Sequence, residues 1–268
     1  MEILVLVGYA AAVIIGISLG LIGGGGSILT VPVLVYILGI DPVLATAYSL
    51  FVVGSTSLVG SFTYMKSQLV DYRTALVFAI PSFLTVFLTR KFIVPVLPDP
   101  LLVLGDLVIT KSIGIMVFFA VVMLAASYSM IRGNGKNSSE DDTIVQFNVP
   151  LIAIEGIVVG LVTGLVGAGG GFLIIPALVL LAKLPMKMAV GTSLLIIAAK
   201  SLIGFLGDVA NQEIDWKMLL VFTGLSIVGI FIGSSLSKKI NEKLLKKGFG
   251  WFVLLMAFYI IGKELTLI

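Results

Sequence analysis

The sequence predicts an all-α polytopic membrane protein made of two homologous halves. Of its 268 residues, 59% are hydrophobic and only 12% are charged, about half the charged fraction of a soluble globular domain. Stretches such as 1–40, with Glu2 as their one charge, can cross a hydrocarbon core of about 30 Å. The first apolar run has no basic segment before it and no small-residue cleavage site after it. We therefore expect a retained membrane helix in a multi-pass protein of the cell membrane.

The composition excludes several classes of function. The chain contains no cysteine and no histidine, which rules out disulfides, thiolate nucleophiles and any mechanism that needs an imidazole. The net charge of +3 and the pI near 9.0 come from Lys and Arg in short interhelical loops, where a cytoplasmic positive bias is typical. The expected partners are the lipid bilayer and a small solute, with no nucleic acid, metal or cofactor, and a homodimer is left open.

An internal repeat supports the division into halves. Residues 16–87 align without a gap with residues 160–231, and about a third of the aligned positions are identical. The matches include five glycines, and Pro32 aligns with Pro176 and Asp71 with Asp215. Two unrelated hydrophobic segments would not agree at glycine, proline and aspartate together, so the pattern indicates a duplication.

Polar residues divide each half into five apolar segments. In the first half they cover 3–22, 27–39, 43–64, 73–93 and 112–131, and in the second 149–167, 171–183, 186–208, 216–236 and 248–266. The second segment of each half is about 20 Å long, too short to span a bilayer, and is predicted to be a half-helix or a re-entrant arm. The first repeat is thus assigned to 1–131, a polar cytoplasmic linker to 132–148 and the second repeat to 149–268.

Loop charges predict how the halves lie in the membrane. Basic residues gather at 66–73, 132–136, 183–187 and 238–247, and placing all four groups in the cytoplasm is consistent with five segments per half. The two repeats would then have inverted topology, with both termini outside. Arg90, Lys91 and Lys111 do not fit this assignment.

Glycine runs separate the first and second segments of each half. Several nearly adjacent glycines break a helix, and such a break is tolerated in a membrane only where protein or a hydrated cavity satisfies the freed backbone groups. The next short helix then directs free N–H groups and a positive dipole end into the gap, which favours anions. The alternative role is close helix packing, to which we assign Gly16, Gly20, Gly160 and Gly164 from their small-xxx-small spacing.

These two glycine-rich runs, at 20–32 and 164–176, each end in a proline. They resemble the runs of the TauE/SafE family of sulfite exporters. The resemblance covers nearly the whole chain. It implies a permease for sulfite, an organosulfonate or a related sulfur oxyanion, with small carboxylates as an alternative substrate class. No ATP-binding motif is present, so transport is expected to be secondary; a passive anion channel is the alternative. An intramembrane aspartyl protease that uses Asp106 and Asp208 is disfavoured, since neither residue lies in a Gly-x-Gly-Asp context.

Lys200 is the main candidate for an electrostatic partner of an anion. It lies in the middle of segment 186–208, where a charge costs about 2.5 to 3.5 kcal/mol, and it shares one helical face with Ser193 and Gly204. The first repeat has Thr56 at the equivalent place. The alternatives for Lys200 are a buried ion pair with Glu155 and a side chain that extends along the helix to the membrane surface.

Hydroxyl groups complete the candidate set, because they can donate to an oxyanion, although hydroxyls in membrane helices often bond their own backbone. Asp71 and Asp215 are instead predicted to cap helices. The candidate substrate-binding residues are Gly23, Gly24, Gly25, Gly26, Ser27, Ser49, Thr56, Gly167, Gly169, Gly170, Gly171, Thr192, Ser193 and Lys200, and no residue is assigned a catalytic role.

Overall fold

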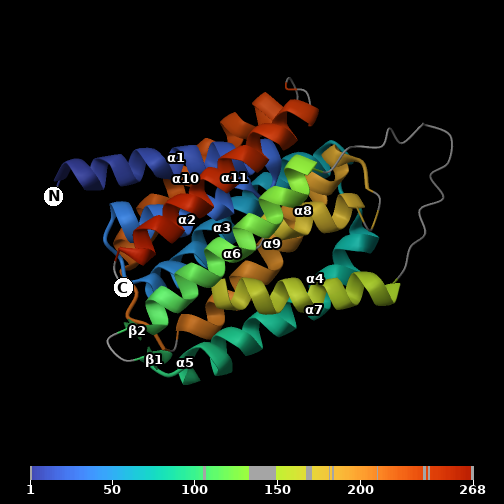
Figure 1. The fold of residues 1–268 in the computed structure, drawn as a ribbon. Helices are drawn as coiled ribbons and strands as arrows, with labels where there is room; N and C mark the ends of the chain where they lie inside the picture. The colour runs from blue at the N-terminus through green and yellow to red at the C-terminus, as the bar shows by residue number, and fades with distance from the viewer. Residues whose placement is uncertain are drawn as a thin grey trace.

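Long helices lie side by side in an elongated bundle, with both chain ends at the same end of the molecule (Figure 1). The computed structural model describes residues 2–104, 107–132, 149–166, 171–180, 182, 184–209, 211–237, 240 and 242–266. Among these, five helices are long and apolar enough to cross a membrane by length and composition. The predicted all-α polytopic class is confirmed.

The helices of both halves follow the predicted segments. In the first half they are α1 (Glu2–Ile22), α2 (Gly25–Pro32) with the π-helix η1 (Val33–Ile37), α3 (Pro42–Lys66), α4 (Tyr72–Leu88) with η2 (Thr89–Ile93) and α5 (Val94–Val96), and α6 (Lys111–Arg132). In the second half they are α7 (Val149–Val166), α8 (Gly171–Leu180), α9 (Met186–Val209), α10 (Trp216–Ser237) and α11 (Glu242–Leu265). Helix α11 begins six residues before the expected position, because the charged residues ahead of the apolar run are also helical.

The structure adds one strand pair to the predicted elements and confirms a predicted helix cap. A short antiparallel pair, β1 (Leu102–Leu104) and β2 (Leu107–Ile109), lies between α5 and α6 and was not predicted. The predicted cap at Asp71 is confirmed, since its carboxylate accepts from the N–H groups of Arg73 and Thr74. Asp41 caps α3 in the same way. The predicted linker lies outside the described residues, apart from Arg132.

Helix packing pairs the two halves. Helix α1 packs against α10 as its counterpart α7 packs against α4, and α3 contacts α10 as α9 contacts α4. The counterparts α3 and α9 pack on each other, as do α6 and α11. Each of these contacts between a helix of the first half and one of the second has an equivalent contact between their counterparts, so the same packing arrangement occurs twice in the bundle.

Glycines permit the closest of these approaches, at equivalent positions. A Cβ atom on Gly16 would collide with the backbone carbonyl of Ser226, and one on Gly160 would lie 2.5 Å from that of Ser82. A methyl group at either glycine would push the helices apart, which supports the packing role predicted for both.

Helices α3 and α9 run in opposite directions where they pack. Gly54 lies beside Leu202, whereas Tyr64, further along α3, lies beside Gly191 near the start of α9. By this register, Thr56 lies level with its counterpart Lys200. The opposite orientation of the two halves in a membrane stays a prediction.

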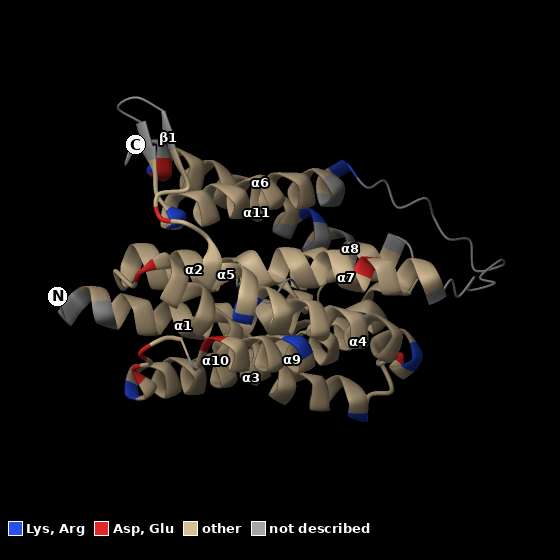
Figure 2. Cartoon of the chain, turned by 90° about the horizontal axis from the view of Figure 1, so that it is seen from below, with Lys and Arg blue, Asp and Glu red and all other residues tan. Residues whose placement is uncertain are grey.

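The surface suits a lipid environment. In Figure 2 most of the ribbon segments coloured for charged residues lie near the two ends of the bundle, and few lie along its middle. On α4, Leu76, Ile80 and Leu84 form an exposed apolar stripe one helical turn apart, each at least half exposed. In a bilayer such a stripe faces hydrocarbon, and the buried polar groups face the protein interior.

Candidate functional site

The two glycine turns meet inside the bundle. Gly24, which precedes α2, lies against Gly171, the first residue of α8, so closely that a Cβ atom on either would collide with the other's backbone. Gly23 has a φ of +74°, a conformation that glycine adopts without steric cost. Gly26 packs against the carbonyl of Ile15 in α1.

The short helices therefore begin next to each other. The first N–H groups of a helix have no carbonyl one turn earlier to bond, and the helix dipole makes this end positive. In α2 these groups belong to Gly25 and Gly26, both buried. The hydroxyl of Ser27 donates to the carbonyl of Gly24 over 2.6 Å and so holds the turn. Three further candidates, Gly167, Gly169 and Gly170, lie outside the described residues.

Helix α9 runs past these turns and carries Lys200. Ser193 lies against Gly23, and Ile197, close to one turn before Lys200, lies against Gly171. The Lys200 side chain is fully buried, and its ammonium donates to the hydroxyl of Thr163 on α7 over 3.0 Å.

No carboxylate lies within 4 Å of the Lys200 ammonium in the described part of the chain. The alternative pairing with Glu155 is therefore wrong: the buried Oε1 atom of Glu155 has no hydrogen-bond partner among the described residues. Both residues lie in apolar helices, but the helix contacts do not bring the two charges together. Lys200 is therefore a buried amine with a hydroxyl partner.

The candidate hydroxyls separate into two groups. Thr192 accepts from the N–H of Asp71 over 2.9 Å, and Ser193 donates to the carbonyl of Val190 over 2.8 Å. These two therefore stabilise the protein itself in this structure. In contrast, four buried hydroxyls on α3 and α9 have no hydrogen-bond partner in the described region: Ser49, Thr56, Ser57 and Ser201.

One buried ion pair was missed by the sequence analysis. The Nε atom of Arg90 donates to Oδ2 of Asp208 over 2.7 Å, and both side chains are almost completely buried. Arg90 also donates to the hydroxyl of Thr46 and to the carbonyl of Gly164, over 3.0 and 3.2 Å. Arg90 does not fit the loop-charge rule because it lies inside the protein. This misfit was the feature of the sequence that could have indicated a buried arginine.

Comparisons with known proteins agree with this architecture. Residues 8–260 match the family described as "Sulfite exporter TauE/SafE". A probable membrane transporter protein of Xylella fastidiosa is 29% identical over 256 residues, which cover 94% of this chain and 92% of the relative. The probable membrane transporter protein YunE of Bacillus subtilis is 29% identical over 267 residues, covering 89% and 90% of the two chains.

No solved structure matches the chain. The family match extends over both halves, including the described parts of the glycine turns and of the α3 and α9 pair. Both relatives are named as probable membrane transporter proteins. The chain therefore belongs to the TauE/SafE sulfite exporter family of membrane transporters.

Proposed function

We propose that this transporter carries a small anion, of the sulfur oxyanion or organosulfonate class, across the cell membrane through a site between the two glycine turns and Lys200. The observation that carries the proposal is that Lys200 is fully buried and that no carboxylate of the described residues lies within 4 Å of its side-chain nitrogen. The proposal rests on what the buried charge requires and on the donors around it.

A buried ammonium needs more than one hydroxyl. Lys has three N–H donors, and among the described residues Lys200 donates to one group, the hydroxyl of Thr163. Moving a charge out of water costs several kcal/mol unless a counter-charge and hydrogen bonds offset the cost. An anionic substrate would supply that counter-charge during transport.

The neighbouring groups are suited to the same ligand. The start of α8 lies beside Ile197 of α9, about one turn from Lys200, and Gly24, directly before α2, lies against the first residue of α8. Helix N-termini bind anions through their free N–H groups. Among the hydroxyls without a hydrogen-bond partner in the described region, that of Thr56 lies level with Lys200 on the adjacent helix. It is a further donor, because a hydroxyl hydrogen rotates to reach a new acceptor.

The family description supports this substrate class. Sulfite and small sulfonates present three oxygens to such donors; small carboxylates present two and are the alternative class. The sequence contains no nucleotide-binding motif, which favours secondary transport driven by an ion or anion gradient.

The test is anion binding and uptake by the purified protein. Sulfite, thiosulfate, sulfate, methanesulfonate and acetate are compared by thermal shift, and the best ligand is then followed into liposomes. We expect Lys200→Met to weaken binding about 10- to 150-fold, the equivalent of about 1.5 to 3 kcal/mol for a charge-assisted hydrogen bond. Lys200→Arg should retain more of the affinity.

Lys217→Met is the matched control, because Lys217 is exposed at the start of α10. The Lys217→Met protein should bind the anion with normal affinity. Normal anion affinity in a folded Lys200→Met protein would refute the substrate role. Uptake that neither a proton gradient nor an anion on the opposite side accelerates would favour a passive channel.

A further inference from the structure

A cavity lined in part by hydroxyl groups lies at one end of the bundle. It has a volume of about 190 Å³, enough for an oxyanion with several waters, since a water occupies about 30 Å³ in the liquid. Its lining comes from α3, the loop after α3, the start of α9 and the end of α10. The lining residues are Thr63, Tyr64, Ser67, Leu69, Lys187, Ser234 and Ser237.

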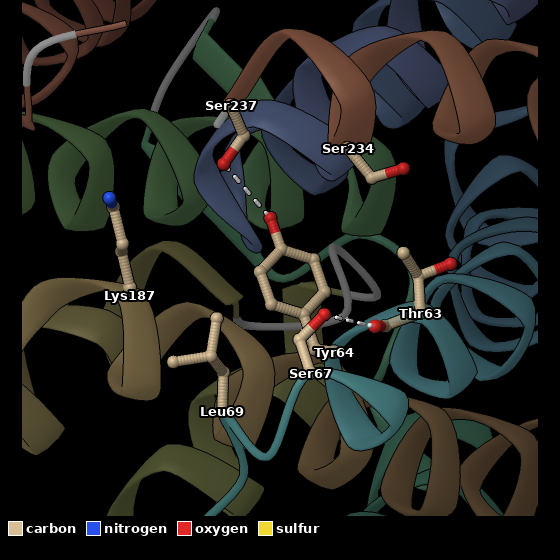
Figure 3. Close-up of a pocket in the computed structure, with 7 residues that line it drawn as sticks. All are labelled: Thr63, Tyr64, Ser67, Leu69, Lys187, Ser234 and Ser237. Atoms are coloured by element: carbon tan, nitrogen blue, oxygen red, sulfur yellow. Dashed lines mark hydrogen bonds between the residues drawn. The ribbon is translucent and has the colours of Figure 1, made fainter. Parts of the chain in front are cut away.

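The lining chemistry favours an anion. Of the seven described residues that line it, five carry hydroxyls, one carries an ammonium and none carries a carboxylate. Figure 3 shows Tyr64 in the middle of the group, with Lys187 on one side and Thr63 and Ser234 on the other. In this structure Ser67 donates to the carbonyl of Thr63 over 3.1 Å, a bond that a rotated hydroxyl can exchange for a stronger one to an anion.

Tyr64 connects this cavity to the first glycine turn. Its ring is buried, and its hydroxyl donates to the carbonyl of Gly20 over 2.9 Å and contacts the hydroxyl of Ser237 at 3.1 Å. Gly20 lies in the last turn of α1, directly before the break at Gly23. The Tyr64 side chain thus lies between the cavity and the glycine turns.

The opposite end of the bundle has different side chains at the equivalent positions. In the repeat alignment, Asp208 corresponds to Tyr64 and Gly164 to Gly20, and the same offset, continued three residues beyond the alignment, pairs Arg90 with Ser234. The carbonyl of Gly164 also accepts a side-chain hydrogen bond, here from Arg90, which is paired with Asp208. The ion pair fills the place that corresponds to the Tyr64 and Ser234 side of the cavity.

We propose that the cavity is an anion-capture site, distinct from the site at Lys200, in which Lys187 and the surrounding hydroxyls bind an oxyanion before it passes Tyr64. This inference rests on the proposed function for its place in transport. Anion binding in the cavity can be tested separately from binding at Lys200, because Lys187 lines the cavity and Lys200 bonds Thr163.

The test uses the absence of native cysteine. Thr63→Cys places a thiol in the cavity, and Tyr72→Cys places one on an exposed position at the same end. Each is modified with an anionic and a cationic methanethiosulfonate of similar size. The ratio of anionic to cationic rates should be higher at position 63 than at position 72, and Lys187→Met should lower it roughly fivefold at position 63.

Occupancy is measured by protection. Sulfate or methanesulfonate should slow modification at position 63 but not at position 72, with chloride at equal ionic strength as the control; sulfite is avoided because it reacts with the reagent. We expect protection to persist in Lys200→Met and to disappear in Lys187→Met. Thermal shift verifies that each variant is folded.

Three outcomes would overturn the capture site: no protection at position 63, equal protection at both positions, or protection that depends on Lys200 but not on Lys187. The last would mean that the cavity is only a passage to the inner site. If Lys200→Met leaves anion affinity intact while Lys187→Met removes protection, the proposed inner site fails and the capture site stands.

Discussion

Helices α3 and α9 are counterparts in the two halves, yet they bring different groups to the centre of the bundle. The first has Thr56 and the second Lys200 at the equivalent position, and the two lie level where the helices pack. Both side chains are fully buried. The repeated features are the glycines and the packing, whereas the charge occurs in one copy.

The two ends of the bundle differ in the same manner. Tyr64 and Ser237 border a hydroxyl-lined cavity at one end, while Arg90 and Asp208 form an ion pair at the other. Repetition thus gives the scaffold, and departures from it give the polar chemistry.

The largest expected effect is on stability, from Arg90→Met. This change leaves Asp208 buried without its cation, and breaking such a pair costs about 3 to 5 kcal/mol. Thermal unfolding of the purified protein measures the loss. Lys91→Met is the control, because this neighbouring lysine is exposed.

The double variant Arg90→Met with Asp208→Leu should recover most of that stability, since no unpaired charge remains. A double variant as unstable as the single one would show that packing around Arg90, and not charge pairing, accounts for the loss.

The next effect is on anion affinity, from moving the central charge between the halves. Lys200→Thr should weaken binding by about 1.5 to 3 kcal/mol. Adding Thr56→Lys should restore part of it, because Thr56 lies level with Lys200 and its hydroxyl has no partner among the described residues. Anion titrations followed by thermal shift measure both, and unchanged binding by Lys200→Thr would contradict the prediction.

The packing glycines should show a smaller and symmetrical effect. Gly16→Ala and Gly160→Ala each place a methyl group against a neighbouring backbone carbonyl, and overpacking costs about 1 to 3 kcal/mol. Unfolding temperatures should fall while anion affinity stays the same.

Gly224→Ala is the control for this pair, because a Cβ atom at Gly224 of α10 would have nothing within 4 Å. It should not lower the unfolding temperature. A large loss of affinity in Gly16→Ala with stability preserved would instead assign Gly16 to the substrate site.

The smallest effect is expected from the backbone of the first glycine turn. Gly23 and Gly39 have φ values of +74° and +69°, and a left-handed conformation costs a non-glycine residue about 1 to 2 kcal/mol. Gly23→Ala should also reduce anion-dependent stabilisation, since its Cβ would lie 2.8 Å from the Ser193 hydroxyl oxygen.

Gly39→Ala separates the two contributions, because space around its Cβ is open. It should cost stability alone. If anion-dependent stabilisation in Gly23→Ala equals that in Gly39→Ala, the first turn has a structural role only.

The sequence by itself determined the membrane class, the ten apolar segments, the two half-length helices and the helix cap at Asp71. These features depend on local composition, on segment length and on a repeat that is visible without a structure. It also identified Lys200 as unusual, because a charge in a long apolar segment is costly wherever the helix packs.

Only the tertiary structure decided what each polar group contacts. The partner of Arg90 lies 118 residues away, and Lys200 bonds Thr163 and not Glu155. The cavity at Tyr64 is assembled from two helix ends, a helix start and a loop. Side-chain partners across helices depend on rotation and register, which local sequence patterns do not specify and which packing of the two halves fixes.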